Sequence, residues 1–134
     1  MSALIRVEDV HRTYRQGEID VHALRGVSVD IAKGEFTALA GPSGSGKTTL
    51  LNLVGCLDRP TQGRVMIDGD EISAMTGTDA ANYRLEHIGF VFQAYNLIPV
   101  LTARENAEFI LQLRGVPPEE RKSIVMPLLE RVGL

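Results

Sequence analysis

The chain has little of several residue types that small proteins use for cross-linking or metal binding. It holds one cysteine, Cys56, and no tryptophan among its 134 residues, and aromatic residues make up only 5%. A single cysteine excludes an intramolecular disulfide framework and any zinc site built from several thiolates. We expect Cys56 to be a small buried apolar residue on a helix face rather than a reactive thiol.

Excess charge and long apolar runs are also scarce. The formal net charge is -3, from 14 Lys and Arg against 17 Asp and Glu. The chain therefore has no excess of positive charge with which to bind the phosphate backbone of nucleic acid. The longest apolar stretch, Leu50 to Leu57, contains Asn52 and is too short to cross a bilayer. Charged residues at positions 6, 8 and 9 interrupt the first apolar segment, which argues against a signal peptide. These features predict a soluble, reduced, cytoplasmic protein with no nucleic-acid partner.

The composition that remains is that of an ordinary globular protein, and the length predicts one domain. Short β-prone segments dominate the first part of the chain, with a polar loop at residues 15–18 and the turn pair Asp68-Gly69 between them. Strands are expected near residues 4–10, 27–31, 36–40, 65–67 and 88–92.

Helices are expected in the last third of the chain. Thr102 and Glu105 form a capping box, in which each side chain satisfies a free backbone donor of the other residue. The helix that follows should end near Arg114, before the breaker segment 115–118. A last helix should begin near Glu119, with Pro127 kinking or breaking it. The pattern as a whole is that of an α/β protein.

The most specific motif is a glycine-rich loop between the expected strand 36–40 and an apolar-periodic helix. Its residues fit G-x-x-x-x-G-K-[ST] in full. Glycines allow successive N–H groups to converge on phosphate oxygens, and the helix that begins near Lys47 directs its free donors at the same anion. Lys47 adds a positive charge, the Thr48 hydroxyl suits Mg²⁺, and Thr49 could reach an α-phosphate. The expected phosphate-binding residues are Gly41, Pro42, Ser43, Gly44, Ser45, Gly46, Lys47, Thr48 and Thr49.

With this loop placed, the sequence resembles the nucleotide-binding domain of ABC transporters, and within that family the lipoprotein-releasing and macrolide-export type. The resemblance runs along the whole chain in the family's order. It rests on Tyr14, the loop 41–49, and the segments 55–63, 88–93 and 96–106. It implies a P-loop NTPase core with an N-terminal antiparallel β-subdomain and the start of a helical subdomain. The implied division is 1–92 for the β-subdomain and core, and 93–134 for the Q-loop and helical part.

The resemblance also implies roles for individual residues. Tyr14 would stack on adenine, and Gln93 would be the Q-loop glutamine that reaches Mg²⁺ and the attacking water. Lys47 and Gln93 would serve catalysis, and Thr48 and Gln93 would hold the metal. The implied cofactors are ATP and Mg²⁺. The implied partners are an integral membrane permease, which would dock after Gln93, and a second nucleotide-binding domain at the inner face of the cell membrane.

The sequence departs from the family in what it omits. No signature motif of the LSGGQ type is present, and Asp68 is followed by Gly69, so it reads as a turn residue rather than as a Walker B aspartate. None of His11, His22 or His87 lies in a switch-histidine context. We therefore expect a truncated chain with exposed apolar surface and no hydrolysis of its own. The alternative is a complete, non-hydrolysing nucleotide-binding module or remnant, and an in-frame continuation beyond Leu134 would distinguish the two. A GTPase-like module is disfavoured, since nothing resembles an Asn-Lys-x-Asp segment.

Overall fold

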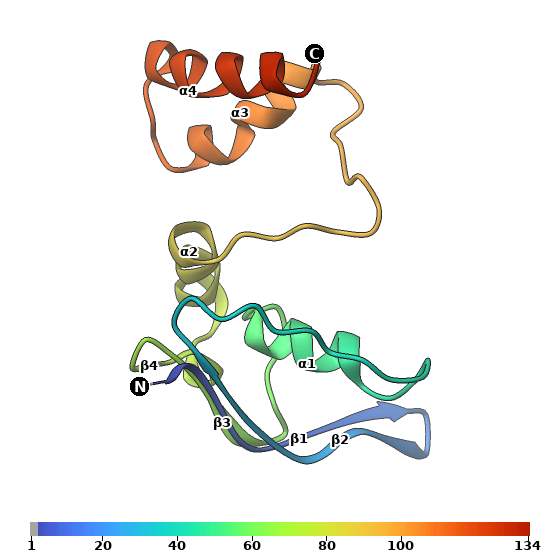
Figure 1. Ribbon diagram of the computed structural model, residues 1–134. Coiled ribbons are helices and arrows are strands. Elements are labelled where there is room, and N and C mark those ends of the chain that lie inside the picture. The colour runs from blue at the N-terminus through green and yellow to red at the C-terminus, as the bar shows by residue number, and fades with distance from the viewer. Residues whose placement is uncertain (1–2) are drawn as a thin grey trace. The chain divides into compact units, whose positions relative to one another are not determined.

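The computed structural model describes residues 3–134, and they form two compact units. The first unit extends to Arg84 and the second begins at Leu85. Figure 1 shows the β-strands and helix α1 in the first unit and helices α3 and α4 in the second. Each unit is described by itself below.

The first unit is built on an antiparallel sheet of four strands in the order β2-β1-β3-β4. Strand β1 (Ala3–Gln16) turns at Gly17 and Glu18 and pairs along its length with β2 (Ile19–Ala32). On its other edge β1 pairs with β3 (Gln62–Ile67). The strands expected near residues 4–10, 27–31 and 65–67 are confirmed, and so is the antiparallel N-terminal subdomain (Figure 1).

The Asp68-Gly69 turn is confirmed as well. It joins β3 to the short strand β4 (Asp70–Glu71), and both turn residues have positive φ, 50° at Asp68 and 91° at Gly69. Positive φ at both central residues is the requirement of the tight hairpin turn that Asp-Gly favours. Asp68 is therefore a turn residue in the structure.

Helix α1 (Lys47–Val54) closes the hydrophobic core of this unit. The buried residues of β1, Val7 and Val10, are three positions apart, because an irregularity at Asp9, which has φ 44°, shifts the register between them. Cys56 is buried as expected, but it lies in the turn after α1 with φ 56° and not on a helix face. The buried residues of the unit are Val7, Val10, Leu24, Leu50, Leu53, Cys56, Val65, Ile72, Ala80 and Tyr83.

Two elements between the sheet and the second unit were not expected from the sequence. A single 3₁₀ turn, η1 (Ile72–Ala74), is followed by helix α2 (Gly77–His87). Only Ala80 and Tyr83 of α2 are buried, so the helix presents a very narrow apolar stripe. A stripe of two residues is too short to show the 3.6-residue period by which a helix is identified.

Two expected strands do not form. Residues 36–40 and 88–92 have no regular secondary structure, and neither has a neighbouring strand within residues 3–134. The side chain of Phe36 is 98% exposed, and the rings of Phe90 and Phe92 stack on each other with centroids 5.6 Å apart. A strand is stable only when another strand satisfies its backbone donors and acceptors. An apolar, β-prone sequence without such a neighbour remains irregular.

The second unit contains helices α3 and α4, which a short breaker segment joins. Helix α3 (Ala103–Leu113) starts at the predicted capping box and ends just before Gly115, which has φ 75°. Of the kink or break expected at Pro127, the break does not form, because helix α4 (Pro118–Arg131) continues through this residue. Proline removes one helical hydrogen bond, and the rest of the fourteen-residue helix is sufficient to continue past it. Val125 is the buried apolar residue of α4.

Within residues 3–134, none of the helices is both long enough and apolar enough to cross a membrane.

Candidate functional site

The glycine-rich loop is held in one conformation by backbone constraints that only glycine satisfies. Gly44 and Gly46 have φ values of 78° and 92°, in the left-handed region. A Cβ atom on Gly46 would lie 2.6 Å from the carbonyl oxygen of Ala23 on β2, so a larger residue could not occupy this position without displacing the strand. The loop is thereby seated against the sheet at the point where α1 begins.

The first turn of α1 supplies donors for an anion. A helix leaves its first four N–H groups without intrahelical partners, and the helix dipole places partial positive charge at the same end. The first turn of α1 contains no acidic residue that would neutralise this charge. Thr48 and Thr49 add hydroxyl groups beside these donors. The arrangement suits a phosphate group, which is the chemistry that the sequence motif predicted.

The Lys47 ammonium group is hydrogen-bonded to the loop itself. It donates to the carbonyl oxygens of Gly41 at 2.6 Å and Pro42 at 2.7 Å, and to the Ser45 hydroxyl at 3.2 Å. The loop is also closed by a turn in which the Ser45 N–H donates to the Pro42 carbonyl. An anion that replaced these acceptors would bind the positive charge of Lys47, which already lies at the loop.

A pocket of about 630 Å³ brings most of the predicted site residues together. Its volume falls within the range of small-molecule sites. The phosphate loop and α1 form one wall, and strands β1 and β2 form another. The pocket is lined by Tyr14, Val21, His22, Ala23, Ser43, Gly44, Gly46, Lys47, Thr48 and Thr49.

Tyr14 sits on β1 within a set of charged contacts. Its hydroxyl donates to Asp58 Oδ2 at 2.8 Å, and the guanidinium carbon of Arg12 lies 4.4 Å from the centroid of its ring. Arg12 in turn donates from Nε and Nη2 to both carboxylate oxygens of Asp58, at 2.9 and 2.8 Å. Tyr14 is thus a fixed wall of the pocket and not a mobile surface side chain.

Gln93 belongs to the second unit, and its side chain is exposed in an irregular segment that follows Phe92. The phosphate loop belongs to the first unit, and the predicted role of Gln93 remains a prediction. Within the described residues, no cluster of three or more His, Cys, Asp or Glu side chains could hold a metal ion. The Thr48 hydroxyl is a hard oxygen ligand of the kind that Mg²⁺ takes, and it is exposed at the pocket.

Several residues of the site were missed by sequence reasoning. Arg12 could have been found, because residues two apart on a strand share a face and Arg12 therefore lies beside Tyr14. The sequence indicates no role for His22, yet this residue lines the pocket and its Nδ1 lies 2.9 Å from the Thr13 hydroxyl. Asp58 offered no local signal, because it is 44 residues from Tyr14 along the chain.

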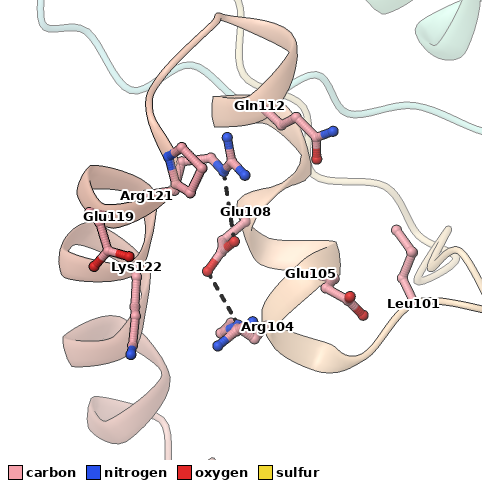
Figure 2. Close-up of a pocket in the computed structure, with 9 residues that line it drawn as sticks. Leu101, Arg104, Glu105, Glu108, Gln112, Glu119, Arg121 and Lys122 are labelled. Carbon is pink, nitrogen blue, oxygen red and sulfur yellow. Dashed lines mark ion pairs between the residues drawn. The ribbon is translucent and has the colours of Figure 1, made fainter.

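A second pocket, of about 380 Å³, lies between α3 and α4 (Figure 2). Its centre is Glu108, whose carboxylate oxygens lie 3.4 Å from Arg104 Nε and 3.7 Å from Arg121 Nε. The side chain of Glu108 is only 11% exposed, so the two arginines compensate a buried charge. The six charged residues around this pocket balance in sign, and we interpret the cluster as the ionic link between the two helices.

Comparison with known proteins identifies the family. Residues 24–134 match the family model described as ABC transporter. An ABC transporter ATP-binding protein of Thermotoga maritima, itself uncharacterised, is 52% identical over the whole of this chain and 57% of its own length. The macrolide export ATP-binding/permease protein MacB of Brucella abortus is 46% identical over 98% of this chain and 20% of its own length.

Solved structures agree with these sequence relatives. The chain is similar to the ATP-binding cassette MJ0796, solved as a dimer bound to ADP and phosphate, with a TM-score of 0.87 and 42% identity. That match covers 94% of this chain and 56% of the cassette. The chain therefore spans about half the length of the Thermotoga maritima protein and of the MJ0796 cassette. The phosphate loop, the sheet that seats it and these matches together show that this chain belongs to the ABC transporter family, as part of its ATP-binding domain.

Proposed function

We propose that this chain carries the Walker A half of the ATP site in the ATP-binding subunit of an ABC transporter. The observation that supports the proposal most directly is the single pocket in which Tyr14, the glycine loop and the start of α1 meet. Triphosphate would lie on the loop and the α1 N-terminus, and adenine would lie on Tyr14. The ADP-bound relative supports the same ligand class.

In this proposal each residue has a separate task. The N–H groups of residues 43–48 bind and orient the phosphates, and Lys47 moves from its carbonyl acceptors to the β- and γ-phosphates. The Thr48 hydroxyl, with Gln93, ligates Mg²⁺, which would neutralise charge on the phosphates. These contacts are positioning and charge stabilisation, the main contributions that proteins make to phosphoryl transfer.

We further propose that ATP hydrolysis belongs to the longer protein. The residue that activates water and the signature motif of a second nucleotide-binding domain are not found in these 134 residues. The intact subunit would dimerise and drive a membrane permease at the inner face of the membrane. The permease would dock on the segment after Gln93, within the proposed division of 1–92 and 93–134. The isolated chain should therefore turn over ATP negligibly, and substantial Mg²⁺-dependent hydrolysis would contradict this.

Replacing Lys47 tests the ATP site directly. Loss of hydrogen bonds from one charged group to phosphate costs about 1.5–3 kcal/mol each, so Lys47→Ala should weaken ATP binding by about 30-fold or more. Isothermal titration calorimetry with ATP and Mg²⁺ measures the change. Lys33→Ala, which removes a lysine of the β2–loop junction outside the pocket, is the matched control. Equal affinity in the Lys47 variant and the parent would overturn the proposed function.

A further inference from the structure

One face of the Tyr14 ring is covered by a cation. The guanidinium carbon of Arg12 lies 4.4 Å from the ring centroid. Tyr14 also lines the pocket that the phosphate loop shares, whereas Arg12 is not among the residues that line it. A base that stacked on Tyr14 would therefore lie on the face opposite Arg12, and Arg12 would support the ring from behind.

Asp58 fixes both members of this stack. One of its oxygens, Oδ2, accepts from the Tyr14 hydroxyl at 2.8 Å and from Arg12 Nε at 2.9 Å, and Oδ1 accepts from Arg12 Nη2 at 2.8 Å. Paired hydrogen bonds from a guanidinium define the orientation of the carboxylate as well as its position. With its hydroxyl bound and one face covered, the Tyr14 ring can neither swing away from β1 nor turn about its own axis without breaking contacts.

Asp58 is itself attached to both walls of the pocket. It follows α1, the helix that starts at the phosphate loop, by four residues. The turn it belongs to is held on β1, where the Thr61 N–H donates to the His11 carbonyl at 2.8 Å and the Thr13 N–H donates to the Thr61 hydroxyl at 3.0 Å. The position of the aromatic ring is thereby tied to the end of the phosphate-binding helix.

The pair is protected enough for these contacts to persist. The side chains of Arg12 and Asp58 are 24% and 27% exposed, against 48% and 57% for the Arg6–Asp30 pair on the same two-stranded region. Arg6 makes one hydrogen bond to Asp30, at 3.2 Å, whereas Arg12 makes two shorter ones to Asp58. Partly buried, bidentate pairs have a defined geometry that single exposed pairs lack.

We propose that Arg12 and Asp58 are positioning residues for the base of the nucleotide, because they hold the ring of Tyr14 at a fixed place and angle relative to the phosphate loop. The inference rests on the proposed ATP site and adds to it two residues that touch neither the base nor the phosphates. Its consequence is selective: loss of the pair should weaken binding of the base and leave binding of the phosphates unchanged.

The experiment compares ATP with inorganic tripolyphosphate, each with Mg²⁺, on the full chain by calorimetry. Stacking of one base on an aromatic ring corresponds to about tenfold or more in affinity, so Tyr14→Ala should weaken ATP by that factor and leave tripolyphosphate within about twofold. Arg12→Gln should weaken ATP by about fivefold, with the same tripolyphosphate result. Arg12→Lys keeps the cation over the ring and one bond to Asp58, and should restore most of the ATP affinity.

Two further variants separate positioning from a general loss of structure. In the double variant Arg12→Gln/Tyr14→Ala, ATP affinity should equal that of Tyr14→Ala alone, since residues that act through one group are not additive. Arg6→Gln, which breaks the exposed pair on the same strand, should change neither ligand. Circular dichroism at the assay temperature checks that each variant is folded.

The outcomes distinguish a failure of this inference from a failure of the proposed ATP site on which it rests. If Tyr14→Ala leaves ATP affinity unchanged, the base site in the proposed function is wrong. If Tyr14→Ala weakens ATP but Arg12→Gln does not, only the positioning inference is wrong. A parallel loss of ATP and tripolyphosphate in Arg12→Gln would also overturn it, because that result indicates a structural role for the whole pocket.

Discussion

Asp58 shows how one carboxylate can acquire an unusual environment from distant parts of a chain. Partial burial raises its pKa, but the Arg59 N–H, the Tyr14 hydroxyl and the Arg12 guanidinium together outweigh this, and the net effect is a lowered pKa. The Arg12 pKa is raised, because its contacts with Tyr14 and Asp58 outweigh the opposing effect of burial. Both groups are therefore charged at neutral pH.

The lowered pKa of Asp58 makes part of the stability of the first unit dependent on pH. Since the folded pKa lies below the unfolded value of about 4, the contribution is complete above that pH and disappears as the pH falls through the folded pKa. Asp58→Asn should melt at a lower temperature than the parent near neutral pH, and the difference should narrow as the pH falls through the lowered pKa of the folded state. Thermal denaturation followed by circular dichroism measures both. A difference that did not vary with pH would contradict the assignment.

At the scale of elements, the start of α3 is the most completely specified feature of the second unit. The Thr102 hydroxyl accepts from the Glu105 N–H at 3.2 Å, and the Glu105 carboxylate accepts from the Thr102 N–H at 2.7 Å. The Thr102 N–H and the Thr102 hydroxyl both donate to Glu105 Oε2, and these two hydrogen bonds lower the pKa of Glu105. Glu105 is therefore ionised at neutral pH. Both hydrogen bonds of the capping box are present, as its sequence pattern predicted.

Removal of the Thr102 hydroxyl should destabilise α3, and a serine hydroxyl at the same position should restore the stability. Thr102→Ala should cost about 1 kcal/mol, because the N–H of Glu105 loses its acceptor. Thr102→Ser keeps the acceptor and should remain close to the parent. Urea denaturation followed by helical circular dichroism compares the three proteins. Equal stability of the alanine and parent proteins would show that water replaces the cap at no cost.

The entry of β3 into the sheet depends on one glycine. Gly63 has φ 83°, and a Cβ there would press against the carbonyl oxygens of Glu8 and Asp9 on β1. Gly69, in the β3–β4 turn, has a similar φ of 91°, but a Cβ there would meet open space. The two positions therefore separate backbone strain from steric exclusion.

Alanine at these glycines should have unequal effects on stability. Gly69→Ala carries only the strain of a left-handed residue, about 1 kcal/mol. Gly63→Ala adds a backbone collision and should cost about 3 kcal/mol or more. Thermal melts of the two variants under identical conditions test the difference. Comparable losses would mean that β3 shifts away from β1 without penalty.

At the scale of the whole chain, large apolar residues are exposed in both units, and three of the most exposed lie in or after the segments 36–40 and 88–92 that were expected to be strands. Phe36 is 98% exposed, Tyr95 is 93% exposed and Val100 is 89% exposed. Exposed apolar surface of this extent is typical of a surface that other protein covers. The chain covers 57% of the Thermotoga maritima relative, which therefore has about three-quarters as much chain again. We propose that this further part of the cassette covers the exposed segments.

The 134-residue chain should therefore self-associate as its concentration rises. Multi-angle light scattering after size exclusion should show species larger than the 14.6 kDa monomer. Replacing Phe36 and Val91 with serine should reduce association, whereas Ile19→Ser, at the tip of the β1–β2 hairpin, should not. A monodisperse monomer with a sharp, cooperative melt would contradict this expectation.

Prediction from the sequence succeeded where the signal is local. The Asp68-Gly69 turn, the capping box at Thr102 and the start of α1 at Lys47 all appear where the pattern placed them. It failed for α2, whose buried face has only Ala80 and Tyr83, and for the strands at 36–40 and 88–92. Those two segments have strand-forming residues, but a strand also requires a neighbour, and the neighbour is not a local property.

The sequence by itself determined the phosphate loop, because glycine, lysine and threonine at fixed spacing dictate the backbone shape and the chemistry together. Through the resemblance to ABC nucleotide-binding domains, it also indicated Tyr14 as the residue that would stack on adenine. Only the tertiary structure decided that Tyr14 reaches the same pocket as the loop, and that Arg12 and Asp58 hold it there. The physical reason is that a carboxylate 44 residues away becomes a partner only after β1 and the turn following α1 have come together.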